Sequence, residues 1–265
     1  MIELVEVHAG YDGEEVLHGI SCVFDSKHLL LGPNGSGKTT LIKVITGLVP
    51  IDSGRVVIDG KDLRSIYGEP GLVATNVEDV YAMLGVSVRD LARLFMDLTG
   101  GDLDQALAMF EEFGLKPRDI NRRKLWELSA GQRKIVTSVL ALCSCAKHVV
   151  LDEPFEQLDP ARKALLLKKI TEYRGTIIIS THETWLIPAL RTWSAYLMFE
   201  GRVYGRIDVE KLQRSKLVPN RVEEALLTFT ISGREFSIVE TGEGKALTDL
   251  ITLDRVYELA MEVSS

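Results

Sequence analysis

The chain has 265 residues, of which 46% are hydrophobic, enough for one sizeable α/β domain with a small appendage or for two modest domains. Lysine and arginine number 31 against 38 acidic residues, which gives a net charge of −7. This sign excludes DNA or RNA as an expected partner, because proteins bind nucleic acids largely by neutralising phosphates.

Membrane insertion and export are not predicted either. The longest mostly apolar run, residues 135–146, is well short of the ~20 residues needed to span a bilayer. The chain opens on a strand-like stretch without the basic start and apolar core of a secretory signal, so we expect a cytoplasmic protein. Three cysteines, Cys22, Cys143 and Cys145, lack zinc-type spacing, and we expect reduced thiols.

The first elements are strands. Residues 2–7 and 16–24 alternate apolar and polar side chains around the turn-forming sequence Tyr11-Asp12-Gly13. This pattern predicts antiparallel strands. A further strand is expected at residues 55–59.

A glycine-rich loop follows the apolar run at residues 29–31 and precedes a helical segment at 39–46. Its residues are Gly32, Pro33, Asn34, Gly35, Ser36, Gly37, Lys38, Thr39 and Thr40. They match G-x4-G-K-[ST] in the strand, loop, helix context that this pattern requires. Backbone N–H groups of such a loop surround a polyphosphate, with Lys38 reaching the β- and γ-phosphates and the Thr39 hydroxyl ligating magnesium.

Helical periodicity follows from about residue 87 to 126 and predicts a helical insertion. The short apolar runs at 149–151 and 176–179 alternate with helices, as the strands of a buried parallel sheet do. After Gly205 we expect a small α/β unit, with a helix near 209–213, strands at 225–231 and 235–239, and a final helix near 253–263.

Two further motifs are weak signals when each is taken alone. Asp152 and Glu153 end an apolar strand, where Asp152 is placed to hold magnesium and Glu153 to activate water, although the pair could simply cap the next helix. The sequence Leu128-Ser129-Ala130-Gly131-Gln132 is by itself an ordinary helix N-cap.

Taken in order, the motifs resemble those of the ATP-binding cassettes of ABC proteins over roughly residues 1–205. The motifs are GPNGSGKTT, LSAGQ, VVLDEP, Leu158-Asp159 and Ser180-Thr181-His182-Glu183. The resemblance implies an α/β P-loop NTPase core with a mostly parallel sheet and an N-terminal antiparallel β subdomain. It also places a helical subdomain at about 77–128 within a cassette at 1–205, leaving a small α/β appendage at 206–265.

The resemblance implies ATP and Mg²⁺ as cofactors and a set of site residues. Two cassettes would sandwich two ATP molecules, with Ser129, Gly131 and Gln132 of one facing the phosphate loop of the other. His182 would contact the γ-phosphate and act in catalysis with Glu153 and Lys38. Asp159 would couple the two sites. Tyr11 would stack on adenine. The alternative for Tyr11 is an ordinary aromatic residue in a turn, and the alternative for His182 is a structural histidine whose hydrogen bonds are satisfied.

The sequence also departs from the family pattern. The glutamine that usually follows the strand before the helical insertion is absent, and Asn76 stands there as a candidate ligand of nucleotide and metal, with Thr75 as the alternative. Ala130 replaces the commoner glycine, and Glu156-Gln157 precedes Leu158 where a small residue is usual.

The function predicted is the ATPase subunit of an ABC transporter. It would work as a homodimer or with a paralogous cassette, on the cytoplasmic face of the membrane, against separate transmembrane subunits. The alternatives are a soluble ABC ATPase, for example in cofactor assembly, and a nucleotide-gated switch that barely hydrolyses ATP.

Overall fold

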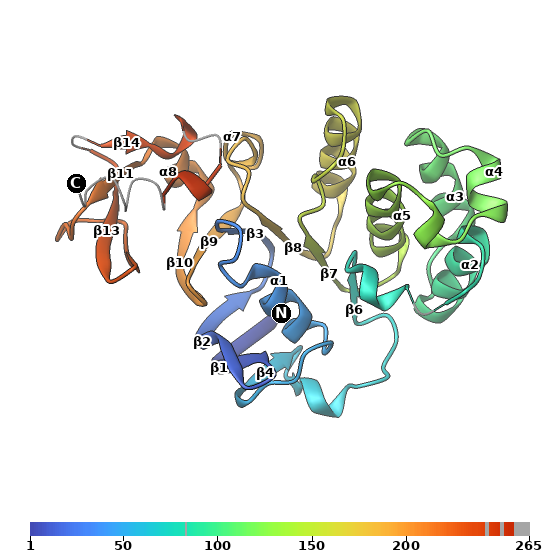
Figure 1. Cartoon of the computed structure of the whole chain (residues 1–265), viewed down its shortest axis with the longest axis horizontal. Helices are drawn as coiled ribbons and strands as arrows, with labels where there is room; N and C mark the ends of the chain where they lie inside the picture. Colours follow the sequence, from blue (N-terminus) through green and yellow to red (C-terminus); the bar gives the residue numbers. More distant parts are fainter. Residues whose placement is uncertain (83, 242–243, 250–251, 257–265) are drawn as a thin grey trace. The chain divides into compact units, whose positions relative to one another are not determined.

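The computed structural model describes residues 1–82, 84–241, 244–249 and 252–256. The chain forms two compact units (Figure 1): Met1–Ser65 with Ser180–Ser265, and Ile66–Ile179. The strand at Thr176–Thr181 crosses the boundary between them. A division into a cassette at 1–205 and an appendage at 206–265 stays a prediction.

The first unit is rich in strands. Its elements are β1 (Ile2–Tyr11), β2 (Glu14–Phe24), β3 (Lys27–Leu31), α1 (Lys38–Ile45), β4 (Ser53–Ile58), β5 (Lys61–Asp62), α7 (Leu186–Ala189), β9 (Ser194–Phe199), β10 (Arg202–Asp208), α8 (Val209–Arg214), β11 (Lys216–Pro219), β12 (Leu227–Ile231), β13 (Arg234–Val239) and β14 (Lys245–Ala246), with short 3-10 turns at Leu63–Ser65 and Leu247–Asp249.

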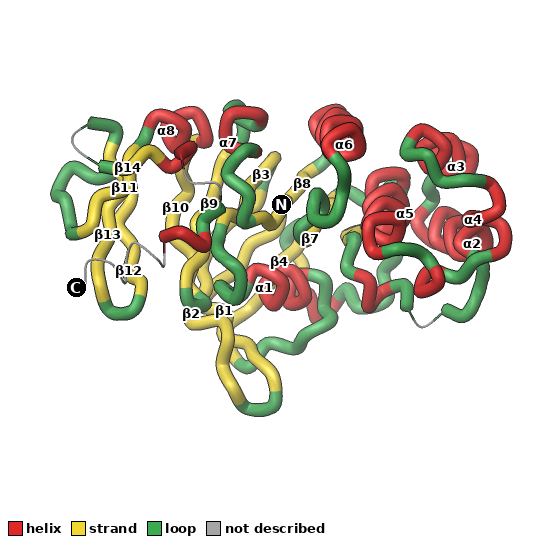
Figure 2. The backbone as a smooth tube through the Cα atoms, turned by 45° about the horizontal axis from the view of Figure 1, so that its top comes forward, coloured by secondary structure: helices red, strands yellow, loops and turns green. Residues whose placement is uncertain are grey.

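Strands β1 and β2 form the predicted antiparallel pair, with Ile2 opposite Phe24 and Tyr11 opposite Glu14. They belong to a sheet of order β2-β1-β4-β5, and α1 packs against β1 and β2 (Figure 2). The alternation seen in the sequence becomes an alternation of burial along β1, because successive side chains point to opposite faces.

In a second sheet, strands β3 and β9 are buried, whereas β10 is largely exposed. Strand β3 pairs parallel with β9, with Leu29 opposite Ala195, and β9 pairs antiparallel with β10. All six residues of β9 are buried, as is typical of a strand in a parallel sheet that is covered on both sides.

The residues after Asp208 form α8 and an antiparallel sheet of order β12-β13-β11-β14. The predicted helix at 209–213 and strands at 225–231 and 235–239 are confirmed as α8, β12 and β13, whereas β11 and β14 were not predicted. Phe229 of β12 stacks on Phe199 of β9, with ring centroids 4.5 Å apart. The Ser232 N–H in the β12–β13 turn donates to the Glu200 carboxylate at 3.0 Å. The predicted helix at 253–263 lies largely outside the described residues.

The second unit carries the helical insertion. Its elements are β6 (Val73–Thr75), α2 (Val88–Thr99), α3 (Leu103–Glu112), α4 (Pro117–Arg122), α5 (Ala130–Cys143), β7 (His148–Asp152), α6 (Pro160–Glu172) and β8 (Thr176–Thr181), with 3-10 turns at Glu78–Val80 and Leu125–Glu127. Within the ranges that the structure describes, no helix is both long enough and apolar enough to cross a bilayer.

Helices α2 to α5 pack on one another and confirm the predicted helical insertion (Figure 1). Local chemistry sets where they begin. The Ser87 hydroxyl accepts from the Asp90 N–H at the start of α2, and Asp102 caps α3. Pro117 begins α4, where its fixed φ suits the first turn.

Strands β6 and β7 pair parallel, with Ala74 opposite Val149, and every residue of β8 is buried. These pairings confirm the predicted α/β fold with a mostly parallel core sheet.

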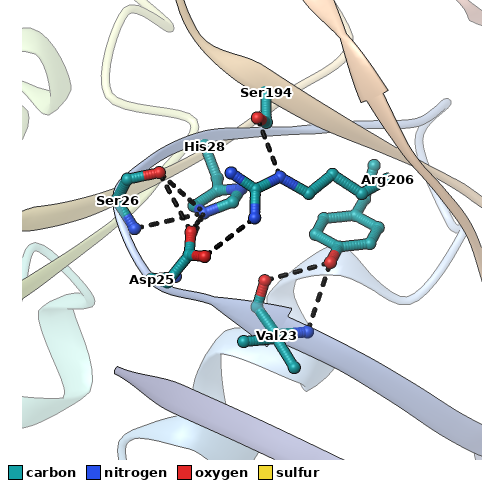
Figure 3. Close-up of polar contacts among 7 residues, drawn as sticks. Val23, Asp25, Ser26, His28, Ser194 and Arg206 are labelled. Carbon is teal, nitrogen blue, oxygen red and sulfur yellow. Dashed lines mark hydrogen bonds and ion pairs between the residues drawn. The ribbon is translucent and has the colours of Figure 1, made fainter.

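A polar cluster joins the β2–β3 turn to strands β9 and β10 in the first unit (Figure 3). Arg206 donates from Nη1 to Asp25 at 2.8 Å and from Nε to the Ser194 hydroxyl at 2.9 Å. The fully buried His28 imidazole accepts at Nε2 from the Asp25 and Ser26 N–H groups. Arg206 lowers the pKa of Asp25 to about 2, whereas burial lowers the pKa of His28. The turn is therefore held by an ion pair between Asp25 and Arg206, residues that lie far apart in the sequence.

This lowered pKa predicts an acid-dependent contribution to stability. Because the folded pKa of Asp25 lies below the ordinary value of about 3.9, its contribution is present above pH ~4 and is lost as pH falls toward about 2. Urea unfolding should show wild type losing its advantage over Asp25→Asn in that window. Asp97→Asn, on the exposed face of α2, is the control. A wild-type advantage equal at pH 5 and pH 2.5 would contradict the prediction.

Candidate functional site

The phosphate loop lies between β3 and α1, as predicted. The Lys38 side chain is 5% exposed, and its ammonium donates to the carbonyls of Gly32 at 2.8 Å and Pro33 at 2.9 Å. The Gly32 N–H in turn donates to the carbonyl of Thr181, at the end of β8, at 3.1 Å. The Lys38 side chain is thus held against the backbone of its own loop.

Close packing explains two of the glycines. A Cβ on Gly32 would lie 2.4 Å from the Met198 carbonyl oxygen, and one on Gly37 would lie 2.8 Å from the Met198 side chain. Gly37 also has a φ of 104°, in the left-handed region that favours glycine. The Gly201 N–H donates to the Ser36 carbonyl at 2.9 Å. The β9–β10 hairpin therefore fixes the backbone of the loop.

Helix α1 begins at Lys38 directly after Gly37, so the N–H groups of its first turn and the positive end of its dipole adjoin the loop. Asn34, Gly35 and Thr39 are exposed, whereas Ser36 and Thr40 are buried. This arrangement suits an anion approaching the loop from its exposed side.

Two other predicted residues lie in the same unit. His182 is half-buried and follows β8, directly after the Thr181 carbonyl that binds Gly32. Tyr11 is 43% exposed at the tip of the β1–β2 hairpin. Asp254, which was not predicted, accepts from the Asn34 N–H of the loop at 2.7 Å. No motif surrounds Asp254, so only the folded structure reveals this contact.

In the second unit the structure brings Asn76 and Asp152 together. Asn76 is 1% exposed; its Nδ2 donates to the Asp152 carbonyl at 3.1 Å, and its Oδ1 accepts from the Asp152 N–H at 2.6 Å. The Lys134 ammonium donates to the same carbonyl at 3.1 Å. The end of β7 is therefore fixed on both sides just before the two carboxylates.

Thr75, the alternative to Asn76, makes hydrogen bonds to the residues that follow it in the chain. Its hydroxyl accepts from the Val77 N–H at 3.2 Å, and its carbonyl accepts from the buried Tyr81 hydroxyl at 2.6 Å. Burial raises the pKa of Tyr81 far above its usual range, which keeps that donor protonated. The Asn76 amide, rather than the Thr75 hydroxyl, hydrogen-bonds to the end of the strand that carries the acidic pair.

Glu153 adopts a φ of 42°, which is uncommon for a residue other than glycine. Such conformations cost about 1–3 kcal/mol and cluster at functional sites. The Glu153 carbonyl accepts from the Glu156 N–H at 3.2 Å, so the strained residue opens a tight turn.

The signature residues begin α5. The Ser129 hydroxyl accepts from the Gln132 N–H, and the Gln132 side chain accepts from the Ser129 N–H at 3.0 Å, so the two form a capping box. A Cβ on Gly131 would lie 2.6 Å from the Gln157 carbonyl oxygen. Asp159 caps α6 by accepting from the Arg162 N–H at 3.0 Å. Gly131 is thus packed against the segment that carries Asp159.

Comparison with known proteins identifies the family. The family described as ABC transporter matches residues 20–156. The taurine import ATP-binding protein TauB of Escherichia coli O157:H7 is 33% identical over 193 residues, which are 69% of this chain and 74% of that protein. The chain belongs to the ABC transporter family. It is an ATP-binding and ATP-hydrolysing subunit, as predicted.

Solved structures agree with this assignment. A crystal structure described provisionally as a cobalt transport ATP-binding protein is 37% identical to this ABC ATPase, with a TM-score of 0.89 over 98% of this chain and 100% of that one. A dimeric ATP-binding cassette bound to ADP and phosphate is 21% identical, with a TM-score of 0.64 over 79% of this chain and 99% of that one, and shows the fold. These relatives give no support to a soluble, non-transport role.

The contact between Gly131 and Gln157 gives a test of this ABC ATPase. The new methyl group of Gly131→Ala meets a backbone oxygen that cannot swing away, at a steric cost of about 1–3 kcal/mol. Alanine gains ~1 kcal/mol over glycine inside a helix, so the free energy of unfolding should fall by up to about 2 kcal/mol. Gly85→Ala, whose Cβ would lie 3.7 Å from Trp126, is the matched control in urea unfolding. A Gly131→Ala protein at least as stable as wild type would refute the steric argument.

Proposed function

We propose that the loop Gly32–Thr40 binds the polyphosphate of ATP, with Lys38 on the β- and γ-phosphates. The supporting observation is the buried Lys38 ammonium, which donates to the carbonyls of Gly32 and Pro33 and is thereby held at the loop. Preorganisation of this kind lowers the cost of ordering the site on binding. Tyr11, exposed at its hairpin tip, is proposed to stack on adenine.

Magnesium is the proposed metal. Thr39 and Asp152 offer the hydroxyl and carboxylate oxygens that a hard cation prefers, and Asn76 adds an amide. When bound, the metal would neutralise charge on the β- and γ-phosphates. The Asn76 amide also contacts both backbone groups of Asp152, so it would position that carboxylate in addition to any contact with the metal.

Glu153 is the proposed general base. It would accept the proton of the attacking water, while His182 and Lys38 would stabilise the γ-phosphate as the bond to ADP breaks. The positive φ of Glu153, directly after the end of β7, is a strained conformation of the kind that clusters at functional sites, and it supports this role.

The working unit is proposed to be a head-to-tail homodimer, or a pair with a paralogous cassette. Ser129 and Gly131, at the N-terminus of α5, would meet the γ-phosphate bound to the other cassette. Gln132, whose side chain caps its own helix, would support the same end of α5. Asp159 would act from the neighbouring helix α6 to couple the two sites.

Glu153→Gln tests this scheme. The substitution keeps the shape of the side chain but removes the base, so turnover should fall by at least about 100-fold while ATP remains bound. An ATP-bound dimer should accumulate, visible by light scattering after size exclusion in ATP and magnesium. Glu156→Gln, an exposed carboxylate in the same turn, is the control. A Glu153→Gln protein that stays monomeric would show that the sandwich is wrong for this chain.

Transmembrane subunits are the proposed partners, with the cassette on the cytoplasmic face of the membrane. The helical insertion carries an apolar patch, defined here as Leu84, Val86 and Trp126, which are 38%, 38% and 51% exposed. Trp126 lies beside Gly85, the residue between Leu84 and Val86, and the Lys124 ammonium lies 5.2 Å from the centroid of the Trp126 ring. Exposed aromatic and aliphatic side chains that gather in this way are typical of protein interfaces.

The patch gives a direct test. Trp126→Glu should prevent a tagged chain from recovering a polytopic membrane protein out of gently solubilised membranes of its host, because a charge would have to be buried. Basal ATPase activity should stay within about twofold of wild type, since surface changes seldom disturb distant sites. Leu48→Glu, at a residue 39% exposed in the first unit, should still recover the partner. Equal recovery by both variants would place the interface elsewhere.

The cargo follows from the membrane partner rather than from this subunit. The descriptions of the two relatives named above differ in cargo, one naming taurine and the other cobalt, although both proteins resemble this chain over most of its length. We therefore assign no cargo from the cassette.

A further inference from the structure

The C-terminal end of the described chain docks beside the phosphate loop. Leu253 donates its N–H to the His182 carbonyl at 3.0 Å, and Thr252 forms an antiparallel bridge with Glu183. Leu253 and Val256 are 1% and 0% exposed. This segment, residues 252–256, is therefore anchored by its backbone and by two buried side chains.

The docked segment places one carboxylate on the loop. Asp254 accepts from the Asn34 N–H at 2.7 Å, a short distance typical of a charge-assisted hydrogen bond. Asn34 is part of the Gly32–Thr40 loop, whose N–H groups are the proposed ligands of the ATP polyphosphate. An anionic side chain of the protein thus uses a donor of the loop that would hold an anionic ligand.

We infer that Asp254 competes with the ATP polyphosphate for the phosphate loop and so lowers the affinity for ATP. This inference rests on the proposed role of the loop. The carboxylate and the phosphates carry the same sign, so the two cannot both lie close to Asn34 without strong repulsion. ATP binding therefore expels Asp254 and loosens segment 252–256 from His182 and Glu183.

The competition also links segment 252–256 to His182, the residue proposed to contact the γ-phosphate. The same segment that holds Asp254 on the loop pairs with the backbone of His182 and Glu183. Loss of the Asp254 contact removes one of the anchors that keep this backbone pairing in place. Because linkage is reciprocal, a partner that draws segment 252–256 away raises the affinity for ATP.

Equilibrium binding tests the inference. Asp254→Ala and Asp254→Asn in the full chain should each bind ATP with magnesium about tenfold more tightly than wild type, the effect of one charge-assisted hydrogen bond lost from the ligand-free state. Asn keeps the shape and an acceptor, so its gain isolates the charge. Glu235→Gln removes an exposed carboxylate of β13 that pairs with Arg221, and this variant should bind ATP as wild type does.

Two readouts separate competition from a structural effect. Binding of adenosine, which lacks phosphates, should be the same in wild type and Asp254→Asn. Hydrogen exchange of residues 252–256 should accelerate when wild type is saturated with ATP. Unchanged ATP affinity in a folded Asp254→Asn protein, an equal gain for adenosine, or unchanged exchange in ATP would each overturn the inference.

A further variant keeps this inference distinct from the proposed function. Lys38→Ala should abolish ATP binding whatever residue 254 is. If Lys38→Ala binds ATP normally, the assignment of the loop fails and the inference fails with it. If Lys38→Ala loses ATP while Asp254→Asn matches wild type, only the role of Asp254 fails.

Discussion

The rest of the nucleotide site depends on a close backbone packing between the phosphate loop and the β9–β10 hairpin. The Ser36 carbonyl accepts from the Gly201 N–H, and Gly32 lies so near Met198 that no side chain fits between them. The backbone of a loop fixed in this way keeps one arrangement, and such preorganisation is what gives electrostatic stabilisation most of its strength. Lys38 then needs only short hydrogen bonds to loop carbonyls to be held in place.

The sequence predicted those parts of the fold whose causes are local. The phosphate loop needs glycines, a lysine and a following helix, all within nine residues. The Ser129 cap needs only Gln132, three positions away, and the β1–β2 pair follows from alternation around a tight turn. Short continuous apolar runs, which indicate strands buried on both faces, marked the parallel sheet, so the α/β class was also predictable.

Contacts between distant residues were beyond this kind of prediction. Asn76 and Asp152 are 76 positions apart, and Asn34 and Asp254 are 220 apart. No local pattern shows that an asparagine amide will pair with the backbone of a strand end, or that an aspartate near the C-terminus will reach a loop near the start. The two-residue strand β14 is too short to leave a periodic signal. The site residues themselves stay predictions until they are measured.

One turn carries two unrelated attachments. At Glu200-Gly201, the Gly201 N–H holds the phosphate loop, and the Glu200 carboxylate accepts from the Ser232 N–H of the β12–β13 turn. If residues 206–265 were exchanged for the corresponding part of another cassette, Glu200 would lose the Ser232 donor. Glu200 directly precedes Gly201, whose N–H binds the Ser36 carbonyl. A chimera that keeps this attachment must supply an equivalent donor, so a change in the β12–β13 turn acts directly on the turn that holds Ser36.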